Sequence, residues 1–180
     1  MRDDYTAVKN PIRSLFRRKP APFPELADVT LRPIGYVRNK VKATKTHWAD
    51  VESVIVLKSE LEPMLLNLGG YSQLIVVFWP HQVPDDVRGS KPQLHPGDDE
   101  KYPLMGVLAT RSQIRPNPVL VTPVRLLAIK GNKLKVRGLD AIDGTPVLDI
   151  KPYLPFYDSI ADAKVPDWVA EAQAWRNSQT

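Results

Sequence analysis

The chain has 180 residues, of which 43% are hydrophobic and 25% are charged. This is the composition of an ordinary globular protein, so we exclude a chain that is disordered throughout, and the length suits a single domain with a real core. Its 18 prolines, against 9 glycines, exclude a wholly helical protein and favour many short strands joined by stiff turns.

The net charge of +5 arises in one segment near the N-terminus. Positions 9–19 contain no acidic residue and five basic ones: Lys9, Arg13, Arg17, Arg18 and Lys19. The remainder of the chain is therefore formally neutral, and the high isoelectric point alone does not indicate a nucleic-acid-binding protein. We interpret residues 1–28 as a basic, proline-rich extension, which is either a solvated tail or an arm that tethers RNA or clasps a subunit.

Residues 29–160 are predicted to form a mainly β domain, because apolar β-forming residues arrive in short bursts between turn residues. We expect an antiparallel sheet or barrel with a few short helices. The predicted strands are 29–38, 51–57, 72–82, 105–110, 119–130, 133–139 and 145–150. Asp143-Gly144 has the composition of a type I′ turn that closes a hairpin.

Two helices are predicted. Residues 59–70 have Ser59 and Glu62 at the spacing of a capping box and Gly69 as a stop signal. Residues 161–180 contain an amphipathic helix. Its apolar face is formed by Trp168, Ala172 and Trp175. We expect this helix to cover a sheet edge or a neighbouring subunit.

Several classes of protein lack support in the sequence. No apolar run reaches the length of a membrane span, and Asp3 and Asp4 argue against a secretory or transit peptide, so we expect a cytoplasmic protein with no membrane partner. The chain has no cysteine, and therefore no disulfide or thiolate. Its histidines, His47, His81 and His95, are not at metal-ligand spacing, and we expect no metal site.

Nucleotide-binding and nucleophile motifs are also missing, since the sequence has no G-x-G-x-x-G segment after a strand, no P-loop and no G-x-S-x-G. Polar residues instead follow apolar strands at three places, 79–82, 110–118 and 140–146. Side chains at strand ends can converge on one pocket. There the arginines would suit a carboxylate or phosphate and Asp143 a hydroxyl or ammonium group, although all of them could equally be scaffolding.

Three stretches carry a resemblance to a known family: "FWPHQ" (78–82), "GVLATRSQIRPNPVL" (106–120) and "RGLDAIDGTPVLDIKPYLP" (137–155). Together they resemble the TrmO/TsaA-like (YaeB-like) family, which uses S-adenosyl-L-methionine to methylate tRNA. The similarity extends from about residue 32 to residue 159. It implies a single-sheeted β-barrel without a Rossmann fold, and a homodimer with its sites near the subunit interface. The implied methyl acceptor is N6 of the threonylcarbamoyl-adenosine next to the tRNA anticodon.

The resemblance also implies roles for individual residues. Cofactor contacts would fall on His81, Gln82, Arg111, Val121, Asp143, Gly144, Thr145 and Pro146. His81 and Asp143 are the candidates for a catalytic proton acceptor, and either can instead be purely structural. Arg115 and Asn117 would face the RNA substrate.

The chain departs from the family pattern at several positions. Leu120 stands where family members have a glycine after R-P-N-P, Gln93 ends a segment that is more basic elsewhere, and the C-terminal extension of longer members is absent. Two alternatives therefore stay open. One is an S-adenosylmethionine-dependent methyltransferase with a different acceptor, and the other is an S-adenosylmethionine-binding protein without catalysis.

Overall fold

The computed structural model describes residues 27–43 and 47–177 of the chain. The chain divides into two compact units, Met1–Thr30 and Leu31–Thr180, and all the elements below belong to the second. The basic segment 9–19 lies outside the described residues, as does nearly all of the extension predicted for residues 1–28.

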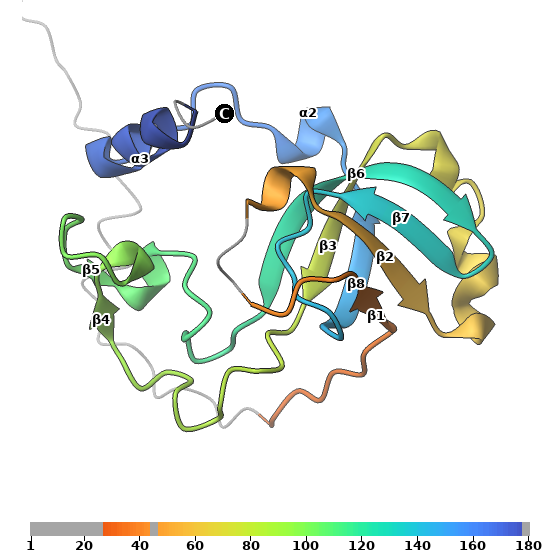
Figure 1. Cartoon of the computed structure of the whole chain (residues 1–180), viewed down its shortest axis with the longest axis horizontal. Helices are drawn as coiled ribbons and strands as arrows, with labels where there is room; N and C mark the ends of the chain where they lie inside the picture. The colour runs from red at the N-terminus through yellow and green to blue at the C-terminus, as the bar shows by residue number, and fades with distance from the viewer. Residues whose placement is uncertain (1–26, 44–46, 178–180) are drawn as a thin grey trace, which may run out of the picture. The chain divides into compact units, whose positions relative to one another are not determined.

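Six antiparallel strands close into a barrel, which confirms the predicted fold class (Figure 1). The strands are β1 (Gly35–Arg38), β2 (Glu52–Leu57), β3 (Gln73–Phe78), β6 (Leu120–Lys130), β7 (Lys133–Arg137) and β8 (Pro146–Pro152). Around the barrel they run in the order β1-β2-β7-β6-β3-β8. Neighbours in the barrel are often distant in sequence, so the loops at its ends bring separate motifs together.

The barrel core follows from the two-residue period of the strands. In β2 the buried residues are Ser53, Ile55 and Leu57, and in β3 every second residue is buried. Successive side chains of a strand point to opposite faces, so one set from each strand fills the interior. The core residues include Val37, Ile55, Leu74, Val76, Phe78, Val124, Leu134, Val136 and Val147.

Two predicted strands are longer than those observed. The predicted strand 29–38 is reduced to β1, because Pro33 has no backbone N–H to donate to a ladder. The predicted strand 72–82 ends at Phe78, just before Trp79-Pro80. The pairing of β3 with β8 also changes register between Val77 and Phe78. Residues 79–82 consequently form a loop at the barrel end.

The predicted strand 105–110 is wrong for most of its length. Met105–Gly106 forms β5, which pairs with β4 (Gln93–Leu94) in a small separate sheet. The next residues form a 3₁₀ helix, η5 (Val107–Ala109). A further 3₁₀ helix, η4 (Pro96–Asp98), lies between β4 and β5.

The turn at Asp143-Gly144 is not a type I′ hairpin turn. That turn needs a positive φ at both central residues, whereas Gly144 has φ +81° and Asp143 is not among the residues with positive φ. In addition, β7 pairs with β2 and β6, while β8 pairs with β1 and β3. Residues 138–145 are therefore a crossing connection between non-adjacent strands, and they pass over the barrel end.

The predicted helix 59–70 is two 3₁₀ helices, η2 (Ser59–Leu65) and η3 (Leu68–Gly70). Pro63 lies inside η2 and cannot donate the hydrogen bond that an α-helix needs there. Asn67 between them is left-handed, with φ 64°. The residue preceding η2 is Lys58, without a side-chain capping hydrogen bond, so the predicted capping box does not form.

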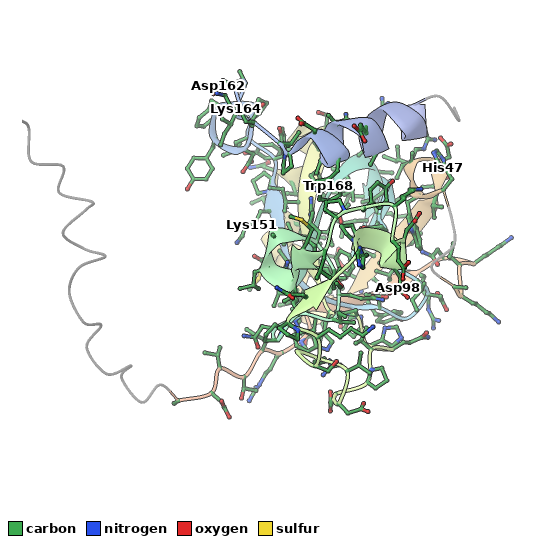
Figure 2. All side chains as sticks on the ribbon, turned by 90° about the vertical axis from the view of Figure 1, so that its left-hand side faces the viewer. His47, Asp98, Lys151, Asp162, Lys164 and Trp168 are labelled. Carbon is green, nitrogen blue, oxygen red and sulfur yellow. The ribbon has the colours of Figure 1, made fainter. Side chains whose placement is uncertain are left out.

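The remaining helices are η1 (Trp48–Asp50), α2 (Pro155–Asp158) and α3 (Asp167–Asn177). The predicted C-terminal helix is confirmed as α3. Trp168, labelled in Figure 2, lies on α3. Its ring packs against that of Tyr102, in the segment between β4 and β5, with ring centroids 5.6 Å apart. The side chain of Trp175 lies outside the described part. Across residues 27–43 and 47–177, no helix is long and apolar enough to cross a membrane.

Candidate functional site

Two adjoining cavities lie at the barrel end where β3 stops and β6 begins. Their volumes are about 360 Å³ and about 210 Å³. Both are lined by the same four residues, Trp48, Gln113, Leu120 and Asp140. Because they share these walls, we treat the two cavities as one cleft.

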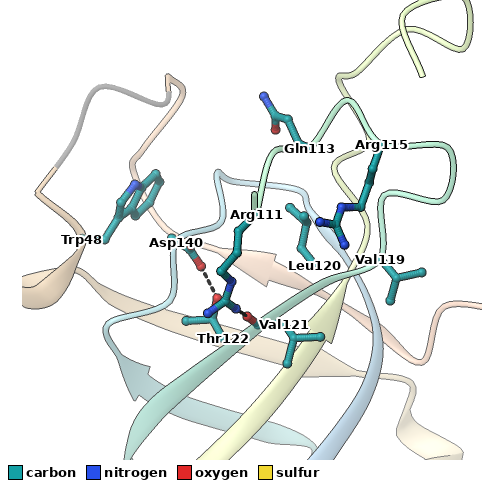
Figure 3. A pocket seen from close by; sticks show the side chains of 9 residues that line it. All are labelled: Trp48, Arg111, Gln113, Arg115, Val119, Leu120, Val121, Thr122 and Asp140. Carbon is teal, nitrogen blue, oxygen red and sulfur yellow. Dashed lines mark hydrogen bonds between the residues drawn. The ribbon is translucent and has the colours of Figure 1, made fainter. Parts of the chain in front are cut away.

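The larger cavity is built around the loop between η5 and β6 (Figure 3). Arg111, Arg115 and Val121 line it together with the shared residues. Arg111 is exposed, and its Nη2 donates a hydrogen bond to the backbone carbonyl of Val121. A guanidinium group carries five N–H donors, so this bond orients Arg111 over the cavity and leaves it chemically suited to an anionic ligand.

Arg115 closes the loop in which it lies. Its Nη2 donates to the carbonyl oxygen of Thr110 at 2.6 Å, and its Nε donates to that of Ser112 at 3.2 Å. Asn117 is exposed, and its carbonyl accepts a bond of 2.8 Å from the amide of Val119. Pro118 is buried. The R-P-N-P run is thus a rigid loop, anchored by Pro118 and braced by Arg115.

The smaller cavity is lined by His81, Gln82 and Thr145 among other residues. His81 and Gln82 are exposed and follow Pro80, whose buried ring holds the start of their loop against the barrel. Thr145 is buried, and its carbonyl accepts a hydrogen bond of 2.9 Å from the amide of Val37. The first and third predicted motifs therefore meet here.

Gly144 lies beside the imidazole of His81. A β-carbon placed on Gly144 would be 3.8 Å from His81 Nε2. The positive φ of Gly144 is one that residues with side chains rarely adopt. The glycine therefore permits both the shape of the turn and the position of the histidine.

Asp143 faces away from the cleft lining. Its Oδ1 accepts a hydrogen bond of 3.0 Å from the amide of Asn39, its Oδ2 lies 3.4 Å from Arg38 Nη1, and its own amide donates to the carbonyl of Val41 at 2.8 Å. Pro146 also has a structural contact, because its carbonyl accepts a hydrogen bond from the amide of Trp79. Asp143 thus joins β1 to the cleft-forming connection.

Asn39 lies outside the cleft lining but supports the connection that forms part of it, a role that the sequence reasoning missed. Its Nδ2 donates to Ser53 Oγ at 2.9 Å and to the carbonyl of Ala141 at 2.8 Å, and its Oδ1 accepts from the amide of Val41. Ser53 is buried, so its hydroxyl needs such a partner. The signal in the sequence was a polar residue directly after a strand, but its partners lie 14 and 102 positions away.

The four shared cleft residues were also missed as site residues, although Gln113 and Asp140 lie within the predicted motifs 110–118 and 140–146. Asp140 accepts a hydrogen bond from the hydroxyl of Thr122. Trp48 reaches the cleft from η1 (Figure 3), far from any of the three motifs in sequence. Only the closure of the barrel brings it there.

The chemistry of the cleft is mixed. Its lining includes the arginines Arg111 and Arg115, the carboxylate of Asp140, and apolar side chains such as Leu120 and Val121. Within the described ranges there is no group of three His, Asp or Glu side chains placed to hold a metal ion. Such a lining suits an elongated ligand that has both charges and an apolar part.

The fold and site define a closed β-barrel with a composite cleft built from its end loops, rather than a nucleotide-binding sheet. Residues 38–159 match the family model described as the tRNA-methyltransferase O N-terminal domain. The chain therefore belongs to this family, which confirms the resemblance noted in the sequence.

Three proteins illustrate the similarity. An S-adenosyl-L-methionine-binding protein of Archaeoglobus fulgidus is 36% identical over 135 residues, which cover 72% of this chain and 93% of that protein. The tRNA (adenine(37)-N6)-methyltransferase of Escherichia coli is 43% identical over 101 residues, covering 54% of this chain and 42% of that protein. A crystal structure of TrmO from Pseudomonas aeruginosa superposes with a TM-score of 0.64 at 31% identity. That match covers 80% of this chain and 63% of the TrmO chain.

Proposed function

We propose that this protein is an S-adenosyl-L-methionine-dependent methyltransferase that acts on tRNA, at N6 of the threonylcarbamoyl-adenosine next to the anticodon. Membership of the family supports the reaction class and the cofactor. The E. coli relative, named as acting on adenine 37 of tRNA, supports the position of the acceptor. The observation that carries the proposal is the single cleft in which the three sequence motifs meet.

The residues of the cleft fit S-adenosylmethionine. Cavities of about 360 and 210 Å³ together lie in the range of small-molecule sites. Arg111 suits the carboxylate of the cofactor, and Asp140 suits its ammonium group or ribose hydroxyls. The missing side chain of Gly144 leaves room beside His81. When bound, this cofactor supplies an electrophilic methyl group on a positively charged sulfur.

We assign the cofactor-binding role to a set of residues on three loops and two strands. They are His81, Gln82, Arg111, Val121, Asp143, Gly144, Thr145 and Pro146. His81, Gln82, Arg111, Val121 and Thr145 would act through the cleft wall that they line. Asp143, Gly144 and Pro146 would act by shaping the turn behind that wall.

The two candidates for a proton acceptor receive different roles. His81 lies at the smaller cavity, and its imidazole can accept a proton from an acceptor nitrogen held there. Asp143 is bonded to Asn39 and Arg38, so we assign it the positioning of the turn that carries Gly144. The main contribution of the site is then the alignment of two ligands and the exclusion of water between them.

The side of the site that faces RNA is the R-P-N-P loop. Arg115 uses its guanidinium to brace this loop, and Asn117 is exposed at its tip. In this proposal Asn117 contacts the substrate directly, whereas Arg115 acts chiefly by keeping the loop rigid. We also propose a homodimer, which the exposed apolar side chains of Phe156, Tyr157 and Ile160 support.

The test is methyl transfer to defined tRNAs. The purified protein is incubated with methyl-labelled S-adenosylmethionine and tRNA that either carries or lacks the threonylcarbamoyl group, and the nucleosides are separated by mass spectrometry. Labelled methyl on the threonylcarbamoyl-adenosine alone is the expected result. Label on another nucleoside identifies a different acceptor, and no label with either tRNA argues against the proposed reaction.

A second candidate function is binding of S-adenosylmethionine without methyl transfer. It is favoured by the Archaeoglobus relative, which is named for binding and which this chain covers almost completely, whereas the chain spans less than half of the E. coli methyltransferase. A methyltransferase with another acceptor is favoured by Leu120, which lines both cavities at the position where family members have a glycine. Saturable calorimetric binding without transfer to any RNA would support the binding protein.

A further inference from the structure

His81 and Gln82 are exposed residues on a loop that is anchored on either side of them by the buried residues Pro80 and Val83. Residues 79–89 contain no helix or strand. Short turn bonds are present, such as that from the amide of Val83 to the carbonyl of Pro80 at 3.0 Å. Neither these turn bonds nor the two buried anchors fix the direction of the exposed side chains between them, so a side-chain contact that spans the pair would restrict it further.

Arg88 supplies this contact from the far end of the loop. Its guanidinium carbon lies 4.8 Å from the centre of the Trp79 ring, and its Nη2 donates a hydrogen bond of 2.8 Å to the carbonyl of Val83. Trp79 precedes His81 and Gln82 in the chain, and Val83 follows them. One side chain therefore holds both flanks of the pair that lines the smaller cavity.

The three contacts of Arg88 differ in strength. Its side chain is only 20% exposed, so the contact with Trp79 and the bond to Val83 are partly removed from water, where both interactions are stronger. Its third partner, Asp85, is 89% exposed, and an ion pair at such a position contributes little. The positioning effect therefore resides in Trp79 and Val83, and Asp85 offers a matched control.

The residue after Arg88 joins this loop to the second cofactor loop. The amide of Gly89 donates a hydrogen bond of 2.8 Å to the carbonyl of Ile114. A β-carbon on Gly89 would lie 3.4 Å from Pro116, and the residue has φ +68°. The loop with His81 and the R-P-N-P loop are thus in direct contact at the Arg88-Gly89 step.

We propose that Arg88 is a positioning residue that fixes the 79–89 loop for cofactor binding and, through Gly89, couples it to the 110–118 loop. The role of the two loops in binding S-adenosylmethionine rests on the function proposed above. An arginine suits this task because its planar fork donates to Val83 and Asp85 while its face lies over Trp79. A lysine keeps the positive charge near the Trp79 ring, but its single ammonium group lacks the planar set of donors that bonds to Val83 and Asp85.

The test compares Arg88→Met, Arg88→Lys and Asp85→Asn with the unchanged protein. Amide hydrogen exchange, read by mass spectrometry without cofactor, should be faster in Arg88→Met by on the order of tenfold in peptides covering 79–90 and 110–119. Peptides from β2 and β7 should be unchanged. Arg88→Lys should be intermediate, and Asp85→Asn should resemble the unchanged protein.

Calorimetric titration with S-adenosylmethionine gives the second readout. We expect the dissociation constant to rise on the order of tenfold in Arg88→Met, with partial recovery in Arg88→Lys. Unchanged exchange in either loop, or faster exchange throughout the barrel, would overturn the positioning role. If the unchanged protein does not bind the cofactor, the proposed function fails, while the exchange data still decide whether Arg88 couples the loops.

Discussion

Arg115 donates a hydrogen bond of 2.6 Å from Nη2 to the carbonyl oxygen of Thr110, five residues earlier in the same loop. With its bond to Ser112, this contact makes Arg115 the internal brace of the R-P-N-P loop. Arg111, the other arginine of the loop, reaches across to β6 at Val121. The two arginines therefore make separable contacts, one within the loop and one between the loop and β6.

Substitution of each arginine should separate these roles. Arg111→Ala should weaken S-adenosylmethionine binding by about 1.5–3 kcal/mol, the value of a charge-assisted hydrogen bond. Its melting temperature should change less than that of Arg115→Ala, because Arg111 makes one exposed bond to Val121 whereas Arg115 makes two part-buried bonds. Arg115→Ala should lower the melting temperature, because two carbonyl groups lose their donor. Calorimetry and thermal unfolding measure the two effects. Equal losses of affinity and stability in both variants would contradict the division of roles.

Gly144→Ala tests the turn beside His81. The left-handed backbone at φ +81° should cost the variant about 1–2 kcal/mol of unfolding free energy. The new methyl group would also occupy the space next to His81 Nε2, so we expect weaker cofactor binding as well. Urea unfolding and calorimetry provide the two measurements.

Gly97→Ala is the matched control for this variant. Gly97 has φ +69°, and no atom lies within 4 Å of an added β-carbon. It should lose stability to a similar extent while binding the cofactor normally. A loss of affinity in Gly97→Ala equal to that of Gly144→Ala would show that backbone strain, and not the neighbourhood of His81, sets the effect.

The barrel itself was predictable from the sequence, whereas the ends of its strands were not. The alternation in residues 52–57 indicates a half-buried strand regardless of its partners. The end of β3 at Phe78 depends instead on the amide of Trp79, which bonds to Pro146 about 70 positions later. Contacts of that range leave no local pattern in the chain.

The candidate site was predictable to the extent that its residues lie in motifs. The three polar segments that follow apolar strands, 79–82, 110–118 and 140–146, contain four residues that line the cleft: His81, Gln82, Arg111 and Asp140. Trp48 has no such signal, because its place depends on how η1 packs at the barrel end. The roles of Asp143 and Arg115 could not be predicted from the sequence. A charged residue in a motif gives the same sequence pattern whether its side chain contacts a ligand or a neighbouring backbone group.

The pH dependence of stability should include a contribution from Glu52 on the outside of the barrel. Its carboxylate bonds to Lys135 and Arg137, and these hydrogen bonds lower its pKa below the ordinary value of 4.5. A carboxylate with a lowered pKa contributes stability that is present above pH 4.5 and is lost as the pH falls through the lowered value. Because the group is exposed, high salt should reduce the contribution.

Thermal unfolding of the unchanged protein and of Glu52→Gln provides the measurement. The variant should be slightly less stable at pH 7 and low salt. The melting temperatures of the two proteins should become equal as the pH falls below 4.5. Glu100→Gln, which replaces another exposed acid, is a control for the loss of charge. A difference in stability between the unchanged protein and Glu52→Gln that persists at acidic pH would contradict this account.

The proposed homodimer predicts a role for the exposed apolar segment after β8. Phe156 is 85% exposed, Tyr157 80% and Ile160 71%, and several large apolar side chains exposed within one short segment suit a surface that a partner covers. Light scattering at micromolar concentration should give the mass of two chains. Replacing Phe156 and Tyr157 by serine should shift the mass toward one chain, and Met64→Ser, at another exposed apolar position, should not.

The basic segment 9–19 should contribute to tRNA affinity without setting the choice of acceptor. Its five basic residues have no acidic neighbour in the segment, and each phosphate contact that they make releases counterions and steepens the salt dependence of binding. Phosphate contacts carry no base information, so discrimination of the modified adenosine must come from the cleft.

Replacing the five residues by glutamine in the full chain should weaken tRNA binding and flatten the plot of log affinity against log salt. The slope should fall by about 0.7–0.9 for each phosphate contact that is lost. Cofactor affinity and the methylated nucleoside should stay the same. An unchanged salt slope would instead assign the RNA contacts to other arginines and lysines of the chain, such as those at the mouth of the cleft.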